Sequence, residues 1–322
     1  VGAQNYTGTI TGEATVSDTL SLDTGADVSD SAITNVDALT LASGASVRMT
    51  AQQNQNFTGA IIAPGIGING ETITINGNGG VTTLAHIENY SIEDDSTNVR
   101  AVTIIQTNTN VTATSNTDAV TFDVGTQTYT GTITGDSTVN DTLILDNGAD
   151  VSGGAIVHVD ALTLASGASV RMTAQQNQNF TGAVTADGTG INGETITITG
   201  DGTVTTLANV ENYIIEDDST DIRTVMINSA NTHVTANSVT DAVTFYLGAL
   251  TFTGTIIGEA TVDDALNLLS LGTGADVSGG VIENVEALTL SSGASVHLSA
   301  AQNQGFTGMI TAPGTGAGGE TV

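Results

Sequence analysis

The residues best suited to bind an ion lie in two short acidic runs. Residues 93–95 and 216–218 both read Glu-Asp-Asp, and each run is followed by Ser-Thr and then by Arg100 or Arg223. Carboxylate oxygens spaced this closely on a loop are the hard ligands that Ca²⁺ prefers. The candidate calcium ligands are Asp94, Asp95, Asp217 and Asp218. The alternative is a solvated turn whose charge the nearby arginine partly offsets.

Histidine would be the natural general acid or base, and the chain has four: His86, His158, His233 and His297. All four occupy repeat positions at which another copy has a different residue. His86 and His158, for example, stand where other copies have Asn, and His297 takes the place of Arg48. These exchanges indicate structural positions, and no Ser-His-Asp arrangement has a candidate.

A pair of carboxylates at the right separation could hydrolyse glycosides, and the chain has 34 Asp and Glu residues that could provide one. They recur with the repeat, however, as in Asp18, Asp141 and Asp264, in Asp27, Asp150 and Asp276, and in Glu71, Glu194 and Glu320. An active site is normally built once, whereas a tailspike-like polysaccharide lyase or hydrolase would concentrate its acids in one repeat. We therefore predict that the chain is not an enzyme, and we assign no catalytic and no cofactor-binding residue.

A repeat of 123 residues must position all of these groups. Tyr6-Thr-Gly-Thr-Ile returns at Tyr129 and, with Phe in place of Tyr, at Phe252. Residues 37–60 recur unchanged as residues 160–183. We predict repeat units at 4–126, 127–249 and 250–322, joined in one continuous solenoid. The last unit stops partway, so we expect the chain to be a portion of a longer array.

A shorter echo lies inside the repeat. The pattern Leu20-x-Leu22-x-x-Gly25 returns as Leu39-x-Leu41-x-x-Gly44. Short alternating strands separated by Gly, Asn and Asp turns are typical of a coil in a parallel β-solenoid. We predict an all-β chain, folded as a right-handed parallel β-solenoid of about 16 stacked coils of ~19–20 residues. The alternative is a series of tandem β-sandwich domains.

Composition agrees with such a fold. Hydrophobic residues make up 39% of the chain but aromatic residues only 3%, so the core must consist of small aliphatic layers. Cysteine is absent, which excludes disulfides and thiolate metal sites. The net charge of −30 disfavours nucleic acids and anionic lipid surfaces as partners. No apolar run approaches the ~18 residues needed for membrane insertion.

Three segments carry a family resemblance. They resemble the VENLTL-x-x-G repeats of giant bacterial surface proteins, and they are residues 35–41 (NVDALTL) followed by Ser-Gly-Ala, residues 210–213 (VENY) and residues 285–290 (VEALTL). These include type I-secreted adhesins and S-layer-like proteins. The resemblance covers nearly the whole chain and implies secretion, placement at the cell surface, and assembly or adhesion. The calcium-binding nonapeptide GGxGxDxUx of one branch is not present in intact form.

From these observations we expect an acidic extracellular structural protein that forms a surface filament, a sheath or an S-layer-like assembly. Its main partner would be itself, through head-to-tail or lateral contacts, together with other cell-surface material. The alternative is the stalk region of a large secreted bacterial adhesin.

Overall fold

The computed structural model describes residues 1–93, 100–114, 116–216, 223–237, 242–259, 268–314 and 319–322. The fold is all-β: parallel strands stack into a β-solenoid of about 13 turns, with three short α-helices. The predicted solenoid is confirmed, and the tandem-sandwich alternative is excluded. The chain forms two compact units, which are described separately. Unit 1 consists mainly of residues 1–145 and 149–163, and unit 2 mainly of residues 164–180 and 184–322.

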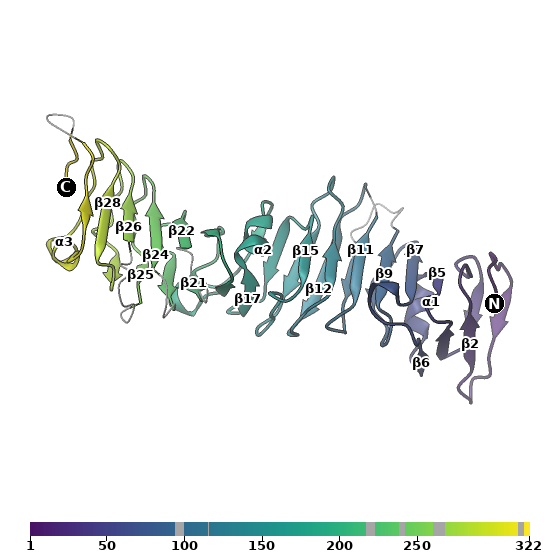
Figure 1. Cartoon of the computed structure of the whole chain (residues 1–322). Coiled ribbons are helices and arrows are strands. Elements are labelled where there is room, and N and C mark those ends of the chain that lie inside the picture. The colour runs from purple at the N-terminus through teal and green to yellow at the C-terminus, as the bar shows by residue number, and fades with distance from the viewer. Residues whose placement is uncertain (94–99, 115, 217–222, 238–241, 260–267, 315–318) are drawn as a thin grey trace. The chain divides into compact units, whose positions relative to one another are not determined.

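Unit 1 contains four parallel ladders. The first pairs β1 (Thr9–Thr11) with β3 (Ala32–Thr34), and the second runs through β2 (Thr19–Leu22), β4 (Ala38–Leu41) and β6 (Ile61–Ile62). The third contains β5 (Ser46–Thr50), β7 (Thr72–Asn76), β9 (Asn89–Ile92), β11 (Asn110–Ala113), β13 (Thr132–Thr134) and β15 (Ala155–Val157). The fourth includes β8 (Val81–Thr82), β10 (Arg100–Thr103), β12 (Val120–Gly125), β14 (Thr142–Leu145) and β16 (Ala161–Leu164). In Figure 1, β7, β9 and β11 lie side by side, as this pairing requires.

Unit 2 repeats the scheme with two ladders of six strands. One contains β17 (Ser169–Thr173), β19 (Thr195–Thr199), β21 (Asn212–Ile215), β23 (His233–Ala236), β25 (Thr255–Ile257) and β27 (Val281–Glu283). The other contains β20 (Thr203–Thr205), β22 (Arg223–Ile227), β24 (Val243–Leu247), β26 (Leu268–Leu271), β28 (Ala287–Leu290) and β29 (Ile310–Thr311). Strand β18 (Val184–Thr185) also belongs to this unit.

The register explains the short echo in the sequence. Leu20 pairs with Leu39 and Leu22 with Leu41, so the echo is one turn of the solenoid. These leucines point into the core and are at most 7% exposed, while the residues between them face outward. Each buried leucine contributes about 1.5–3 kcal/mol by leaving water. Like side chains stacked in register therefore build the aliphatic core.

Turn length varies more than the sequence echo predicts. Ser46 pairs with Thr72, whereas Thr72 pairs with Asn89, so the first of these two turns is much longer than the second. The longer turn accommodates a helix and a 3₁₀ turn between its strands. The expected count of about 16 coils is therefore wrong, because turns that include a helix use more of the chain and fewer of them fit.

The helices are short and recur with the repeat. They are α1 (Ala51–Asn56), α2 (Ala174–Asn179) and α3 (Ala300–Gly305), and the 3₁₀ turns are η1 (Gly67–Asn69) and η2 (Gly190–Asn192). Each α-helix begins with a capping box at Thr50, Thr173 or Ser299. The hydroxyl of this residue accepts from the backbone N–H of the glutamine three residues later, and the glutamine side chain accepts from the backbone N–H of the cap residue. In the part of the chain that the structure describes, no helix is long and apolar enough to cross a membrane.

Candidate functional site

The four aspartates predicted to bind calcium, Asp94, Asp95, Asp217 and Asp218, lie outside the described residues. The glutamate that begins each acidic run is described. Glu93 forms an ion pair with Arg48, 2.7 Å from carboxylate to guanidinium, and Glu216 pairs with Arg171. Arg100 and Arg223, the nearby arginines of the solvated-turn alternative, lie buried at the start of β10 and β22. The partner of each glutamate is therefore an arginine two strands away in the ladder.

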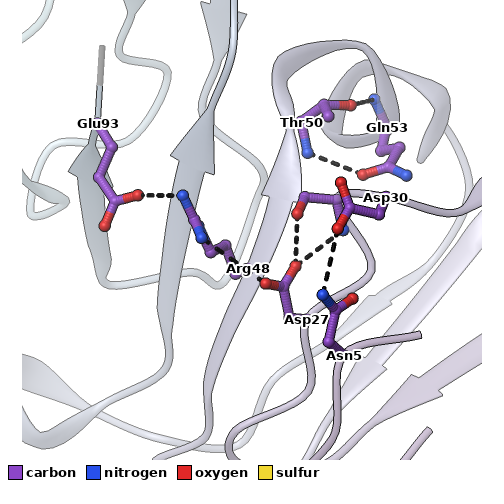
Figure 2. A network of polar contacts seen from close by, with 8 residues as sticks. Asn5, Asp27, Asp30, Arg48, Thr50, Gln53 and Glu93 are labelled. Carbon is purple, nitrogen blue, oxygen red and sulfur yellow. Dashed lines mark hydrogen bonds and ion pairs between the residues drawn. The ribbon is translucent and has the colours of Figure 1, made fainter. Parts of the chain in front are cut away.

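Arg48 belongs to a polar network on the outside of unit 1 (Figure 2). Its guanidinium lies between Glu93 on one side and Asp27 on the other, 3.7 Å away. Asp27 also accepts hydrogen bonds from the backbone N–H and the hydroxyl of Ser29, at 2.9 and 2.6 Å. Because Asp27 and Arg48 are bridge partners in adjacent coils, the fold itself places the charges face to face. The network holds a turn and links successive coils.

The same position in the third copy is occupied by His297. It pairs with Asp276 in the same parallel register, and Asp276 accepts bonds from Ser278 at 3.0 and 2.6 Å. The hydrogen bonds from Ser278, and secondarily the charge of His297, lower the pKa of Asp276. The exchange of Arg48 for His297 seen in the sequence is thus a true structural equivalence.

Histidines at the Asn positions are also explained by backbone shape. His86 and His158 have φ of 64° and 52°, and the Asn residues at matched positions have φ between 54° and 66°. This left-handed conformation favours Asn among residues other than Gly. His86 and His158 thus occupy positions at which the backbone conformation explains the exchange with Asn.

Helix α1 carries two buried amide side chains that act on the backbone of neighbouring coils. Gln53 donates to the carbonyl oxygens of Val28 and Ser31 at 2.7 and 2.8 Å, in the coil before the helix. Asn54, fully buried, donates to the Thr82 carbonyl at 2.8 Å, in the coil after it. The helix therefore supplies the hydrogen bonds that a strand would otherwise give to the coils on its two sides.

A buried tyrosine completes this arrangement, which we call the amide clamp (Gln53, Asn54 and Tyr90 in unit 1). The Tyr90 hydroxyl donates to Asn54 Oδ1 at 3.2 Å and accepts from the Leu84 backbone N–H at 2.7 Å. Burial raises the pKa of Tyr90, so the hydroxyl keeps its proton. A fully buried phenol is tolerated because its hydroxyl both donates and accepts a hydrogen bond.

The clamp recurs in unit 2, and the third copy keeps the bonds of its glutamine. In unit 2, Asn177 donates to the Thr205 carbonyl at 2.8 Å and accepts from the Tyr213 hydroxyl. In the third copy, Gln302 donates to the carbonyls of Val277 and Gly280 at 2.6 and 2.9 Å. The clamp was not predicted from the sequence, although Thr50 followed three residues later by Gln53 is a capping-box pattern that signals a helix start.

A second buried cluster consists of paired glutamates. Glu194 is fully buried and accepts the backbone N–H groups of Gly188, at 2.8 and 2.9 Å, and of Gly167, at 3.1 Å. A Cβ added at Gly188 would lie 2.4 Å from Glu194 Oε2, so the cradle requires glycine there. Glu211 faces Glu194 and is only 9% exposed. We call this arrangement, and its counterpart Glu71–Glu88 in unit 1, the glutamate pair.

Unit 1 builds its glutamate pair in the same way. Glu71 is fully buried and accepts from the N–H of Gly65, at 2.8 and 3.0 Å, and of Gly44, at 3.3 Å. Burial, followed by the hydrogen bond with Glu71, raises the pKa of Glu88. Burial likewise raises the pKa of Glu211. Burial also opposes ionisation of Glu194, but the hydrogen bonds that it accepts outweigh this effect and its pKa is lowered.

Within the described ranges, no three His, Asp or Glu residues come together as metal ligands would. A hollow beside α1 is lined by polar amides, hydroxyls and apolar groups, among them Gln55, Phe57, Thr83 and Leu84. The chemistry of the described clusters is thus hydrogen bonding to backbone and to paired acids. Neither the family models, nor the curated proteins, nor the solved structures contain a match to this chain.

Proposed function

We propose that this chain is a structural protein of an extracellular surface assembly, in which stacked coils provide stiffness and length. The observation that supports this most is the use of the buried polar side chains. Gln53, Asn54 and Glu71 bond to the backbone of neighbouring coils, and their counterparts repeat these bonds. Polar groups buried and satisfied in this way fix one arrangement of the backbone.

Repetition supports the same proposal. Residues 37–60 and 160–183 are identical, and α1 and α2 place Asn54 and Asn177 on equivalent carbonyls at equal distances. Solenoid stability is close to a sum of repeat and nearest-neighbour terms, so each added repeat lengthens the structure without a new core. Repeated surfaces also provide equivalent contacts for further copies of the chain. We therefore propose that the main partner of the chain is another copy of itself.

The charge favours an environment rich in cations. With 34 acids against four bases, stacked coils repel one another unless ions screen them. Dissolved divalent cations outside a cell would supply that screening. This reasoning, together with the resemblance to bacterial surface repeats, leads us to propose the cell surface as the location.

Electron microscopy of the producing cells tests the proposal. Antibodies raised against the 322-residue chain should label a continuous layer, sheath or filament at the cell surface. Single fibres that each end in a distinct tip would favour the adhesin stalk instead, because a stalk carries a separate binding domain. Labelling confined to the cell interior would overturn both forms of the proposal.

A further inference from the structure

The glutamate pairs are placed by the solenoid itself. Glu194 precedes β19 and Glu211 precedes β21, and Thr195 and Asn212, which follow them, are partners in register. Glu71 and Glu88 stand in the same relation to Thr72 and Asn89. Neighbouring strands lie ~4.8 Å apart, so in-register stacking brings two carboxyl groups together. In both units the pair lies on the shortest step of its ladder.

The two carboxyl groups of each glutamate pair need a shared proton to form a hydrogen bond with each other. Glu194 is surrounded by N–H donors that stabilise its charged form. Glu211 Oε2 is buried, and no described donor reaches it. Glu211 and Glu194 nevertheless face each other from in-register positions on neighbouring strands, and so do Glu88 and Glu71. Two carboxylates cannot donate to each other, whereas a carboxylic acid can donate to a carboxylate.

Other charged groups near the pair do not replace that proton. On β23, His233 donates its backbone N–H to the Glu211 carbonyl oxygen, and its side chain belongs to the outward row of that strand. Asp187 lies exposed on the loop beside Gly188. On β17, Arg171 pairs with Glu216 instead. In unit 1, His86 lies two residues before Glu88, in a left-handed turn with an exposed side chain.

We propose that each glutamate pair holds one shared proton at neutral pH and so links two successive coils by a hydrogen bond that fails when the pH rises. The proton resides on Glu88 or Glu211, and Glu71 or Glu194 remains the charged acceptor. Losing the proton would leave two buried like charges one strand spacing apart. The first two repeats thus each carry a pH-sensitive link in their interior.

Infrared spectroscopy of the folded 322-residue chain tests the proposal directly. A protonated carboxyl group has its own C=O stretching band, which should be present at pH 7 and disappear on titration to higher pH. The variant E88Q/E211Q should lack the band, because an amide can donate to Glu71 or Glu194 without a titratable proton. The variant E13Q/E283Q, which removes two exposed acids, should retain it.

Unfolding at different pH values provides a second measurement. The ordinary pKa of Glu is 4.5, and the pKa of Glu88 and of Glu211 is raised above it, chiefly by burial. Between that value and the raised pKa, unfolding releases one proton per pair. The unfolding equilibrium constant should therefore rise about tenfold per pH unit for each pair, relative to E88Q/E211Q. Above the raised pKa, this difference should become constant.

Two results would overturn the proposal. The first is a folded chain at pH 7 with no protonated carboxyl band and the same pH dependence as E88Q/E211Q. The second is a melting temperature that calcium chloride raises in the wild type and in E13Q/E283Q but not in E88Q/E211Q, again without the band. The second result would make the pair a cation site instead of a proton-sharing one.

Discussion

The turns built on Asp27 in the first copy and on Asp276 in the third differ in their charged partner and keep the same backbone. Arg48 in the first copy and His297 in the third each accept a backbone N–H bond, from Val28 at 2.9 Å and from Val277 at 3.0 Å. Gln53 and Gln302 hold the preceding coil through matching pairs of carbonyls. Only Arg48 continues to a second acid, Glu93. Backbone bonds and the amide clamp therefore set the register, and the surface ion pair adds to a coil that is already in place.

The largest effect should come from breaking the clamp where it is buried. Replacing Asn54 by Ala removes the donor to the Thr82 carbonyl and the acceptor of the Tyr90 hydroxyl, and we expect a loss of about 2–4 kcal/mol in unfolding free energy. Asn303 is the matched residue in the third copy and is exposed in this chain, so Asn303→Ala should cost less than about 0.5 kcal/mol. Urea denaturation of both variants makes the comparison. Equal losses would show that Asn54 does not hold the coil after the helix.

Removing the helix caps should produce a smaller effect that is similar in the two copies. Thr50→Ala and Ser299→Ala each remove one hydroxyl that accepts from the N–H three residues on. A cap of this kind is worth about 1 kcal/mol. Thermal melting should report similar losses, and Gln52→Ala, an exposed change within α1, serves as the control. A large loss for Thr50→Ala alone would mean that the clamp depends on the cap.

Exchanging the charged partners should change stability still less. Arg48→His gives the first copy the residue of the third, and it removes an ion pair whose side chains are 42% and 45% exposed. An exposed pair contributes about 0–1 kcal/mol and is screened by salt. We expect a loss within that range that shrinks as sodium chloride is added. A salt-independent loss above ~2 kcal/mol would contradict the idea that the ion pair is dispensable.

The smallest effect concerns the titration of Asp276. Its pKa is lowered by the bonds from Ser278, so the stability that this carboxylate contributes is present above the ordinary Asp value and is lost as the pH falls through the lowered one. Ser278→Ala should move the pKa of Asp276 upward, toward the ordinary value. Carboxyl NMR titration of the wild type and the variant measures the shift. An unchanged pKa would assign the lowering to His297.

The sequence predicts the fold because the decisive contacts are local echoes. Leu20 and Leu39 match in type and in neighbours, and the structure pairs them directly. The unequal turns on either side of Thr72 leave no such echo, because Glu71 and Glu88 lie in dissimilar segments. The pairing of Glu71 with Glu88 depends on the register of two complete turns, and this register cannot be predicted from sequence spacing alone.

The candidate site was predictable only in part. The exchange of His86 with Asn35 follows from their equivalence in the repeat, and the left-handed backbone at both positions explains it. The ion pair of Glu93 with Arg48 joins segments far apart in the sequence, and no sequence pattern connects the two residues. Buried amides such as Asn54 look like ordinary polar residues until the carbonyls that they bond are located.

The identity of residues 37–60 and 160–183 has a consequence for how such a chain changes in length over generations. A chain that gains or loses one whole 123-residue unit joins segments of the same amino-acid sequence. Helices α1 and α2 have the same sequence, so a shortened or lengthened chain would still offer each neighbouring coil the same hydrogen-bonding groups. Length can thus vary in whole steps while the internal chemistry of every step stays constant.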